Sequence, residues 1–70
     1  MNTGSFTSII EALILASPEP LPARRMAQVL EDATPSKVEQ AVTELNHKYT
    51  EAGSSFRIRE IAGGYQFHIL

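Results

Sequence analysis

One stretch decides the fold: Thr34-Pro-Ser-Lys-Val-Glu-Gln-Ala-Val-Thr-Glu-Leu-Asn-His-Lys-Tyr-Thr-Glu-Ala52. It begins with helix-starting residues, since Thr34 can cap exposed backbone N–H groups and Pro35 suits the first helical position. Ser36 and Glu39 offer a competing capping box slightly later. Gly53 follows directly and can adopt the left-handed conformation that ends a helix. The stretch therefore predicts one helix, the longest element of the chain.

The spacing of the apolar residues in this helix predicts which face is buried. They recur every three or four residues, as on one face of a helix, at Val38, Ala41, Val42, Leu45, Tyr49 and Ala52. We expect this stripe to form the floor of the core, with the other elements packed on it. The opposite face carries Lys37, Glu39, Gln40, Thr43, Glu44, His47, Lys48 and Glu51.

The length and the composition limit the sources of stability. Seventy residues without a cysteine make one small domain. A domain of this size buries roughly 60% of its unfolded surface, so its stability is marginal without support. Disulfides are excluded, and two lone histidines, His47 and His68, do not predict a zinc site. We expect no metal and no cofactor, which leaves tight packing, oligomerisation or a partner chain.

The charge balance and the hydropathy bear on the possible partners. The chain has 6 basic and 8 acidic residues, a net charge of −2 with neutral histidines. A free-standing nucleic-acid binder usually has a basic excess, because phosphate contacts dominate its affinity. The longest apolar run, Ala12–Ala16, is far shorter than the roughly 20 residues of a membrane span, and Met1–Ser5 lacks the basic start of a secretory signal. We therefore expect a cytoplasmic chain without a membrane partner.

A further helix is predicted near the start of the chain, over residues 6–16. Its apolar face consists of Phe6, Ile9, Ile10, Leu13 and Ala16. Leu15 falls on the far side of this helix, and Ile14 lies at the border of the apolar face. Leu15 is either an ordinary exposed leucine or part of a contact patch, since single exposed apolar residues are common.

The proline-rich segment Ser17-Pro-Glu-Pro-Leu-Pro22 ends that helix and holds an extended turn. Leu21 in this turn makes either a very short strand or a plug for the core. Pro22 suits a helix start, so we expect another helix over about residues 22–31. Its apolar stripe consists of Ala23, Met26, Ala27 and Leu30.

After residue 55 the apolar pattern becomes alternating, which predicts a β-hairpin. Phe56, Ile58, Phe67 and Ile69 alternate with Arg57, Arg59 and His68. Gly63-Gly64 supplies the positive φ values of a two-residue turn. Pairing Ala62 with Tyr65 across this turn places Ile58 opposite Ile69, on the face that covers the helices. Ile61 is then left on the outer face, unless a bulge shifts the strand.

Three helices followed by a hairpin predict an α+β fold, a winged helix-turn-helix with the hairpin as its wing. We expect residues 1–70 to form a single winged helix domain, and the apolar Leu70 at the end of an apparent strand predicts that the chain is part of a longer protein. Phosphate loops, metal-ligand spacings and catalytic arrangements are absent from the sequence, so we expect no enzyme. The apolar residues left outside the predicted core are candidates for a protein interface: Ile14, Leu15, Ile61 and Leu70.

Many repressors share this architecture, so a DNA-binding transcriptional regulator is the alternative function. In that mode the helix of residues 34–52 would enter the major groove. This helix has two lysines against three glutamates, and it lacks arginine, the usual reader of guanine. Arg57 and Arg59 can reach phosphates, although basic residues on the outer face of a strand are more often solvated. We therefore expect no sequence-specific DNA binding.

Three segments resemble, in the same order, the bacterial family of segregation and condensation protein B. Ile10-Glu-Ala-Leu-Ile-Leu-Ala-Ser-Pro-Glu-Pro-Leu21 is similar to the opening motif of the family. Leu45-Asn-His-Lys-Tyr49 resembles the end of its third helix, and Phe56-Arg-Ile-Arg-Glu-Ile-Ala-Gly-Gly-Tyr-Gln-Phe67 resembles its hairpin. The chain departs from the family at Arg24-Arg25 and Ala33-Thr34-Pro35, where a more acidic helix and turn are typical.

This resemblance implies a non-enzymatic subunit of the bacterial Smc–kleisin complex, a condensin-like assembly in chromosome condensation and segregation. Members of the family carry two winged helix domains in tandem and form homodimers. They bind the kleisin, segregation and condensation protein A, which bridges the Smc heads. The chain would then be the amino-terminal winged helix, the one associated with dimerisation. The second winged helix, used for much of the kleisin contact, lies outside these residues.

Overall fold

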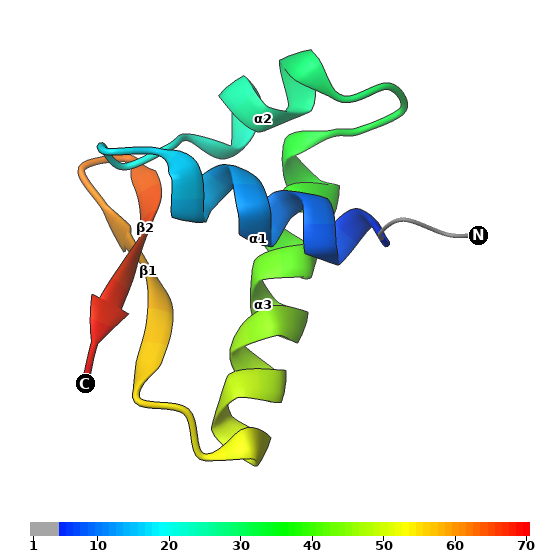
Figure 1. The fold of residues 1–70 in the computed structure, drawn as a ribbon. Coiled ribbons are helices and arrows are strands. Elements are labelled where there is room, and N and C mark those ends of the chain that lie inside the picture. The colour runs from blue at the N-terminus through cyan, green and yellow to red at the C-terminus, as the bar shows by residue number, and fades with distance from the viewer. Residues whose placement is uncertain (1–4) are drawn as a thin grey trace.

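The longest helix organises the molecule, as the sequence predicts. A computed structural model describes residues 5–70. It contains α1 (Phe6–Ala16), α2 (Ala23–Val29), α3 (Pro35–Ala52), β1 (Phe56–Ile61) and β2 (Gly64–Ile69). Figure 1 shows α1 lying across α3, α2 at one end of α3, and the hairpin along its side. Three helices followed by an antiparallel hairpin confirm the predicted α+β winged helix fold.

Local signals set both ends of α3. The Thr34 side chain accepts a hydrogen bond from the Lys37 backbone N–H at 3.2 Å, so Thr34 is the cap and the competing box does not form. Gly53 ends the helix in the left-handed conformation with φ of 69°. The predicted stripe is buried from Val38 to Tyr49. Ala52 is exposed, contrary to the prediction, because it lies in the last turn where the chain leaves for the hairpin.

The shorter helices differ from their predictions in detail. α1 has the predicted bounds, but its buried face is turned toward Ile14 and away from Ile9 and Ala16, which are exposed. α2 begins after Pro22 and ends at Val29, two residues earlier than predicted. The chain leaves α2 in an extended conformation and then turns through Asp32, which has a positive φ of 60°.

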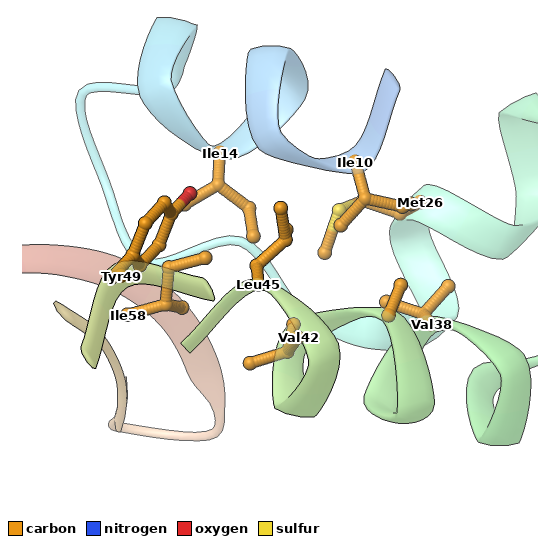
Figure 2. Close-up of a cluster of buried hydrophobic side chains, with 9 residues drawn as sticks. Ile10, Ile14, Met26, Val38, Val42, Leu45, Tyr49 and Ile58 are labelled. Carbon is orange, nitrogen blue, oxygen red and sulfur yellow. The ribbon is translucent and has the colours of Figure 1, made fainter. Parts of the chain in front are cut away.

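The core lies between α1, α2, α3 and the first strand (Figure 2). Its buried side chains are Ile10, Ile14, Met26, Val38, Ala41, Val42, Leu45, Tyr49 and Ile58. Five of them come from α3, which confirms that this helix is the floor of the core. Within residues 5–70, no helix has the length and apolar character needed to span a membrane.

The register of the hairpin corrects one prediction. Ile61 pairs with Gly64 and Ile58 pairs with Phe67, so the turn consists of Ala62 and Gly63 rather than Gly63-Gly64. Ala62 and Gly63 have φ of 52° and 82°, both positive as a type I′ turn requires. The pairing is shifted by two residues from the predicted one, which leaves every side chain on its predicted face. Ile61 accordingly lies on the outer face of an unbulged strand.

A backbone contact far from the turn explains this register. Leu21 and Tyr65 form an antiparallel bridge, with N–H···O distances of 2.9 Å and 2.8 Å. Leu21 thus forms a one-residue strand, and its side chain also packs on the core. The bridge brings Pro20 against Gly64, where a Cβ atom would lie 2.6 Å from the Pro20 carbonyl carbon. Gly64 is needed inside the strand for this close approach, so it is not available for the turn.

We expect Gly64→Ala to lower the free energy of unfolding by about 1–3 kcal/mol, since the new methyl group collides with rigid backbone. Urea denaturation followed by circular dichroism measures the change. Ala62→Gly is the control, because glycine suits the positive φ at that position and should leave stability equal or higher. An unchanged midpoint for Gly64→Ala would contradict the close approach.

Candidate interaction surface

The four residues that the sequence suggests for an interface have different environments. Leu15 and Leu70 are 70% and 71% exposed, and Ile61 is 37% exposed. Ile14 is only 2% exposed and lies in the core, so its placement at the border of the helix face was wrong. Ile61 lies beside the hairpin turn on the outer face, away from Leu15. The structure therefore does not gather these residues into one patch.

Leu15 instead borders an apolar groove between α1 and the inner face of the hairpin. Glu11, Leu15, Phe56, Phe67 and Ile69 line this α1–hairpin groove, whose volume is about 230 Å³. Ile69 is 72% exposed, although the alternating pattern assigned it to the buried face of the hairpin. Ile69 is the last residue of β2, and a residue at the end of a strand can extend past the helices that cover the rest of that face.

Aromatic rings form the floor of the groove. Phe56 packs edge-on against Tyr49 with ring centroids 4.9 Å apart, and Phe67 packs against Phe56 at 5.7 Å. Such tilted contacts are favourable because the positive edge of one ring meets the negative face of the other. The rings pack α3 against both strands, so contacts within the chain hold the floor of the groove in place.

The one charged residue of the groove is engaged within the chain. The Tyr49 hydroxyl donates a hydrogen bond to Glu11 Oε2 at 2.5 Å. Burial, this hydrogen bond and the negative charge of Glu11 together raise the pKa of Tyr49 well above its usual value. The contact links α1 to α3 and turns the Glu11 carboxylate toward the protein. The groove thus offers apolar surface and one carboxylate, which accepts a hydrogen bond from within the chain.

We expect Tyr49→Phe to lower the free energy of unfolding at neutral pH by about 1–2 kcal/mol, because it removes a hydrogen bond to a charged group and keeps the ring. Urea unfolding measures the loss. Tyr65→Phe is the matched control, since it removes the hydroxyl of a half-buried tyrosine that takes no part in the Glu11 contact.

The same hydrogen bond predicts a weakening at alkaline pH. Tyr49 keeps its proton to a higher pH in the folded chain than in the unfolded chain, where tyrosine titrates near pH ~10. Its contribution is therefore complete below about pH 10 and is lost as the pH rises above that value. Stability measured across this range should decline less in Tyr49→Phe than in the native chain. An equal loss of stability in the two proteins would show that Tyr49 does not cause the alkaline weakening.

A residue that the sequence analysis passed over holds the hairpin to α3. The Asn46 side chain accepts a hydrogen bond from the Ile58 N–H at 2.8 Å and donates one to the Ile58 carbonyl at 2.9 Å. It thereby occupies the outer edge of β1 as a neighbouring strand would. A local sequence pattern could not predict these hydrogen bonds of Asn46, because Ile58 lies twelve residues away in the chain.

The exposed face of α3 has the composition that the sequence predicts. All eight residues assigned to it are exposed. His47 Nε2 lies 3.2 Å from Glu51 Oε2, and the Lys37 ammonium donates to the Asp32 carbonyl at 3.1 Å. The Lys37 contact thus engages part of the limited positive charge of this helix.

A second hollow is lined by several acidic residues. It has a volume of about 570 Å³ and lies between the start of α1, the turn before α3 and α3 itself. Glu31, Asp32 and Glu44 line it against a single cation, Lys37. This excess of carboxylates disfavours phosphate ligands. Within residues 5–70, His, Asp and Glu side chains form no group of three that could hold a metal ion.

Comparisons with known proteins add to this description. Residues 8–69 match the family described as segregation and condensation complex subunit ScpB. Segregation and condensation protein B of Syntrophotalea carbinolica is 39% identical over 66 residues, which are 94% of this chain and 33% of the relative. The name of the family describes a subunit of a segregation and condensation complex.

Two solved structures share the fold. A conserved hypothetical protein from Chlorobium tepidum superposes with a TM-score of 0.82 at 42% identity, over 91% of this chain and 40% of that protein. ScpB from Mycobacterium tuberculosis gives a TM-score of 0.81 at 17% identity, over the whole of this chain and 43% of that protein, a likeness of fold alone. The chain thus spans less than half of each matched structure and about a third of the curated relative.

Proposed function

Because the chain belongs to the segregation and condensation complex subunit ScpB family, we propose that it is a dimerising module of a non-enzymatic subunit of the bacterial Smc–kleisin complex. The α1–hairpin groove is the observation that supports dimerisation. In this groove Leu15 and Ile69 are each about 70% exposed, next to the rings of Phe56 and Phe67. Contiguous exposed apolar surface of this kind is typical of protein interfaces.

The proposal extends to the rest of the assembly. We propose that residues 1–70 are the amino-terminal winged helix of a longer tandem protein, which the threefold greater length of the curated relative supports. Contact with the kleisin, segregation and condensation protein A, and through it with Smc, is assigned to that longer protein. The complex would act on the nucleoid, in the cytoplasm.

A DNA-binding regulator remains the alternative on architecture alone, and the charges speak against it. The exposed face of α3 presents three glutamates to the position that phosphates would take. Arg57 in the hairpin donates to the Ser54 and Phe56 carbonyls at 2.9 Å and 2.6 Å, so its guanidinium is engaged by its own loop.

We expect gel shifts with duplex DNA to show at most weak binding that does not depend on sequence. Affinity measured at two salt concentrations separates the two functions, because true phosphate contacts give a steep loss of binding as salt rises. Tight, sequence-selective binding at moderate salt would favour the regulator.

For dimerisation, we expect Leu15→Glu to weaken self-association at least tenfold, because it places a charge in apolar surface that a second copy would cover. Sedimentation equilibrium of the chain over a range of concentrations measures the dissociation constant. Val29→Glu is the matched control, since Val29 is similarly exposed, at 67%, but lies on α2 away from the groove. A native chain that stays monomeric at high concentration would remove dimerisation from the proposal.

A further inference from the structure

The second strand has an open edge along half its length. Tyr65 directs its N–H and carbonyl away from β1, because both bond to Leu21. Alternate residues of a strand direct these groups to the same side, so Phe67 and Ile69 point theirs the same way. Leu70 confirms this alternation, because its N–H points the other way, to the Ser55 carbonyl at 2.9 Å. Within residues 5–70, the outward groups of Phe67 and Ile69 have no backbone partner.

Prolines explain why the chain does not cover this edge itself. A third strand running back from Leu21 would bring residues 19 and 17 opposite Phe67 and Ile69. Pro18 and Pro20 interrupt that path, and the Glu19 N–H turns instead to the Ser17 hydroxyl at 3.4 Å. The third strand is therefore one residue long, and the edge beyond Tyr65 stays available.

This edge also lacks the usual protection against pairing. Native proteins guard exposed strand edges with charged residues, prolines, bulges or covering segments. β2, Gly-Tyr-Gln-Phe-His-Ile, contains no Lys, Arg, Asp, Glu or proline, and its pairing with β1 shows no bulge. β1 differs, since it carries Arg57, Arg59 and Glu60, and Asn46 occupies its edge. The unguarded edge is thus confined to one side of the hairpin.

We propose that the β2 edge pairs antiparallel with the β2 edge of a second copy of this chain. The inference rests on the proposed dimerisation and names its interface. Antiparallel pairing of identical edges is self-complementary, because each copy supplies both N–H and carbonyl groups. The hairpins of the two copies would then form one continuous sheet. In Figure 1, β2 runs along the side of the molecule to the C-terminus, with this edge at the surface.

Charge favours a second copy as the occupant. The chain has a net charge of −2, so two copies associate best through a surface without free acidic groups. Glu11 is the one acid of the adjacent groove, and its carboxylate is bound by Tyr49. The backbones of Phe67 and Ile69 form the open edge, and their side chains line the groove. Pairing would therefore also bring the exposed Leu15 and Ile69 of both copies close to the twofold axis.

The available backbone groups determine the register. Pairing Phe67 of one copy with Ile69 of the other uses the outward groups of both residues in both copies. Pairing Phe67 with Phe67 would instead oppose Ile69 to Tyr65, whose groups already bond to Leu21. In the first register the two His68 residues lie opposite each other on the twofold axis. Their Cα atoms would be about 4.5 Å apart, as in a non-hydrogen-bonded pair, within the range of about 4.4–6.8 Å that a disulfide spans.

Cysteine substitution tests this arrangement directly, because the chain has no cysteine of its own. We expect His68→Cys to form a disulfide-linked dimer with oxidised glutathione at least tenfold faster than Arg59→Cys. Arg59 is the matched control, since it lies on the same outer face of the hairpin but on β1, one strand farther from the axis. Non-reducing gel electrophoresis over time follows the product, and circular dichroism confirms that both variants are folded.

The possible outcomes distinguish an error in the proposed interface from an error in the proposed dimerisation. If the native chain dimerises but His68→Cys links no faster than Arg59→Cys, the edge belongs to another occupant and the inference is overturned. If the native chain is monomeric by sedimentation, the proposed dimerisation itself is wrong. Fast linkage of His68→Cys that is lost in His68→Cys combined with Leu15→Glu supports one interface made of edge and groove.

Discussion

The bridge between Leu21 and Tyr65 is the contact on which the rest of the hairpin depends. Two hydrogen bonds tie the proline-rich turn after α1 to the second strand. They draw Pro20 so close to Gly64 that a side chain there would collide with backbone. Gly64 must therefore belong to the strand, and the turn falls on Ala62 and Gly63 even though Ala62 needs a positive φ. The strand register follows from that choice, whereas the faces of the hairpin are those that the alternating pattern predicts.

The distribution of the core explains why the hairpin is only partly covered. The buried hydrophobic side chains come from the three helices and from Ile58 of β1, and none comes from β2. A two-stranded sheet is marginal by itself, so its attachment to the helices matters. Here Ile58 and the aromatic rings of the strands pack on the core, and polar contacts at the two edges add to that attachment, with Asn46 on β1 and Leu21 on β2. The inner face beyond the core stays accessible as the α1–hairpin groove.

Local chemistry predicted much of the fold from the sequence. The ends of α3 depend on Thr34 and Gly53, and its buried face depends on spacing along one helix, so both could be foreseen. The bounds of α1 were foreseen for similar reasons. The rotation of α1 was not, because the Glu11–Tyr49 bond that accompanies it joins residues 38 positions apart. A helical pattern alone could not choose between Ile14 and Ile9 as the buried residue.

The candidate site was harder to predict, because it depends on contacts between elements. The helical pattern marks Leu15 as a surplus apolar residue, whereas the alternating pattern assigns its neighbours Phe56, Phe67 and Ile69 to the covered face of the hairpin. Alternation predicts which face a strand residue is on, but it does not predict how far the helices extend beneath that face. Leu70 and Ile61 are exposed as expected, yet neither lines the groove.

The charges and the apolar residues on the surface favour association with another protein chain over binding to DNA. Three of the six basic side chains are held by nearby groups: Lys37 by the Asp32 carbonyl, Arg57 by its loop, and Arg59 by His68 at 3.1 Å. Positive charge is thus both scarce and partly engaged, which weakens the usual use of a winged helix. Exposed apolar surface lies instead where Phe67 and Ile69 meet the groove. Because these residues offer apolar side chains on one face and unpaired backbone groups at the edge, an extended strand is the partner that satisfies both.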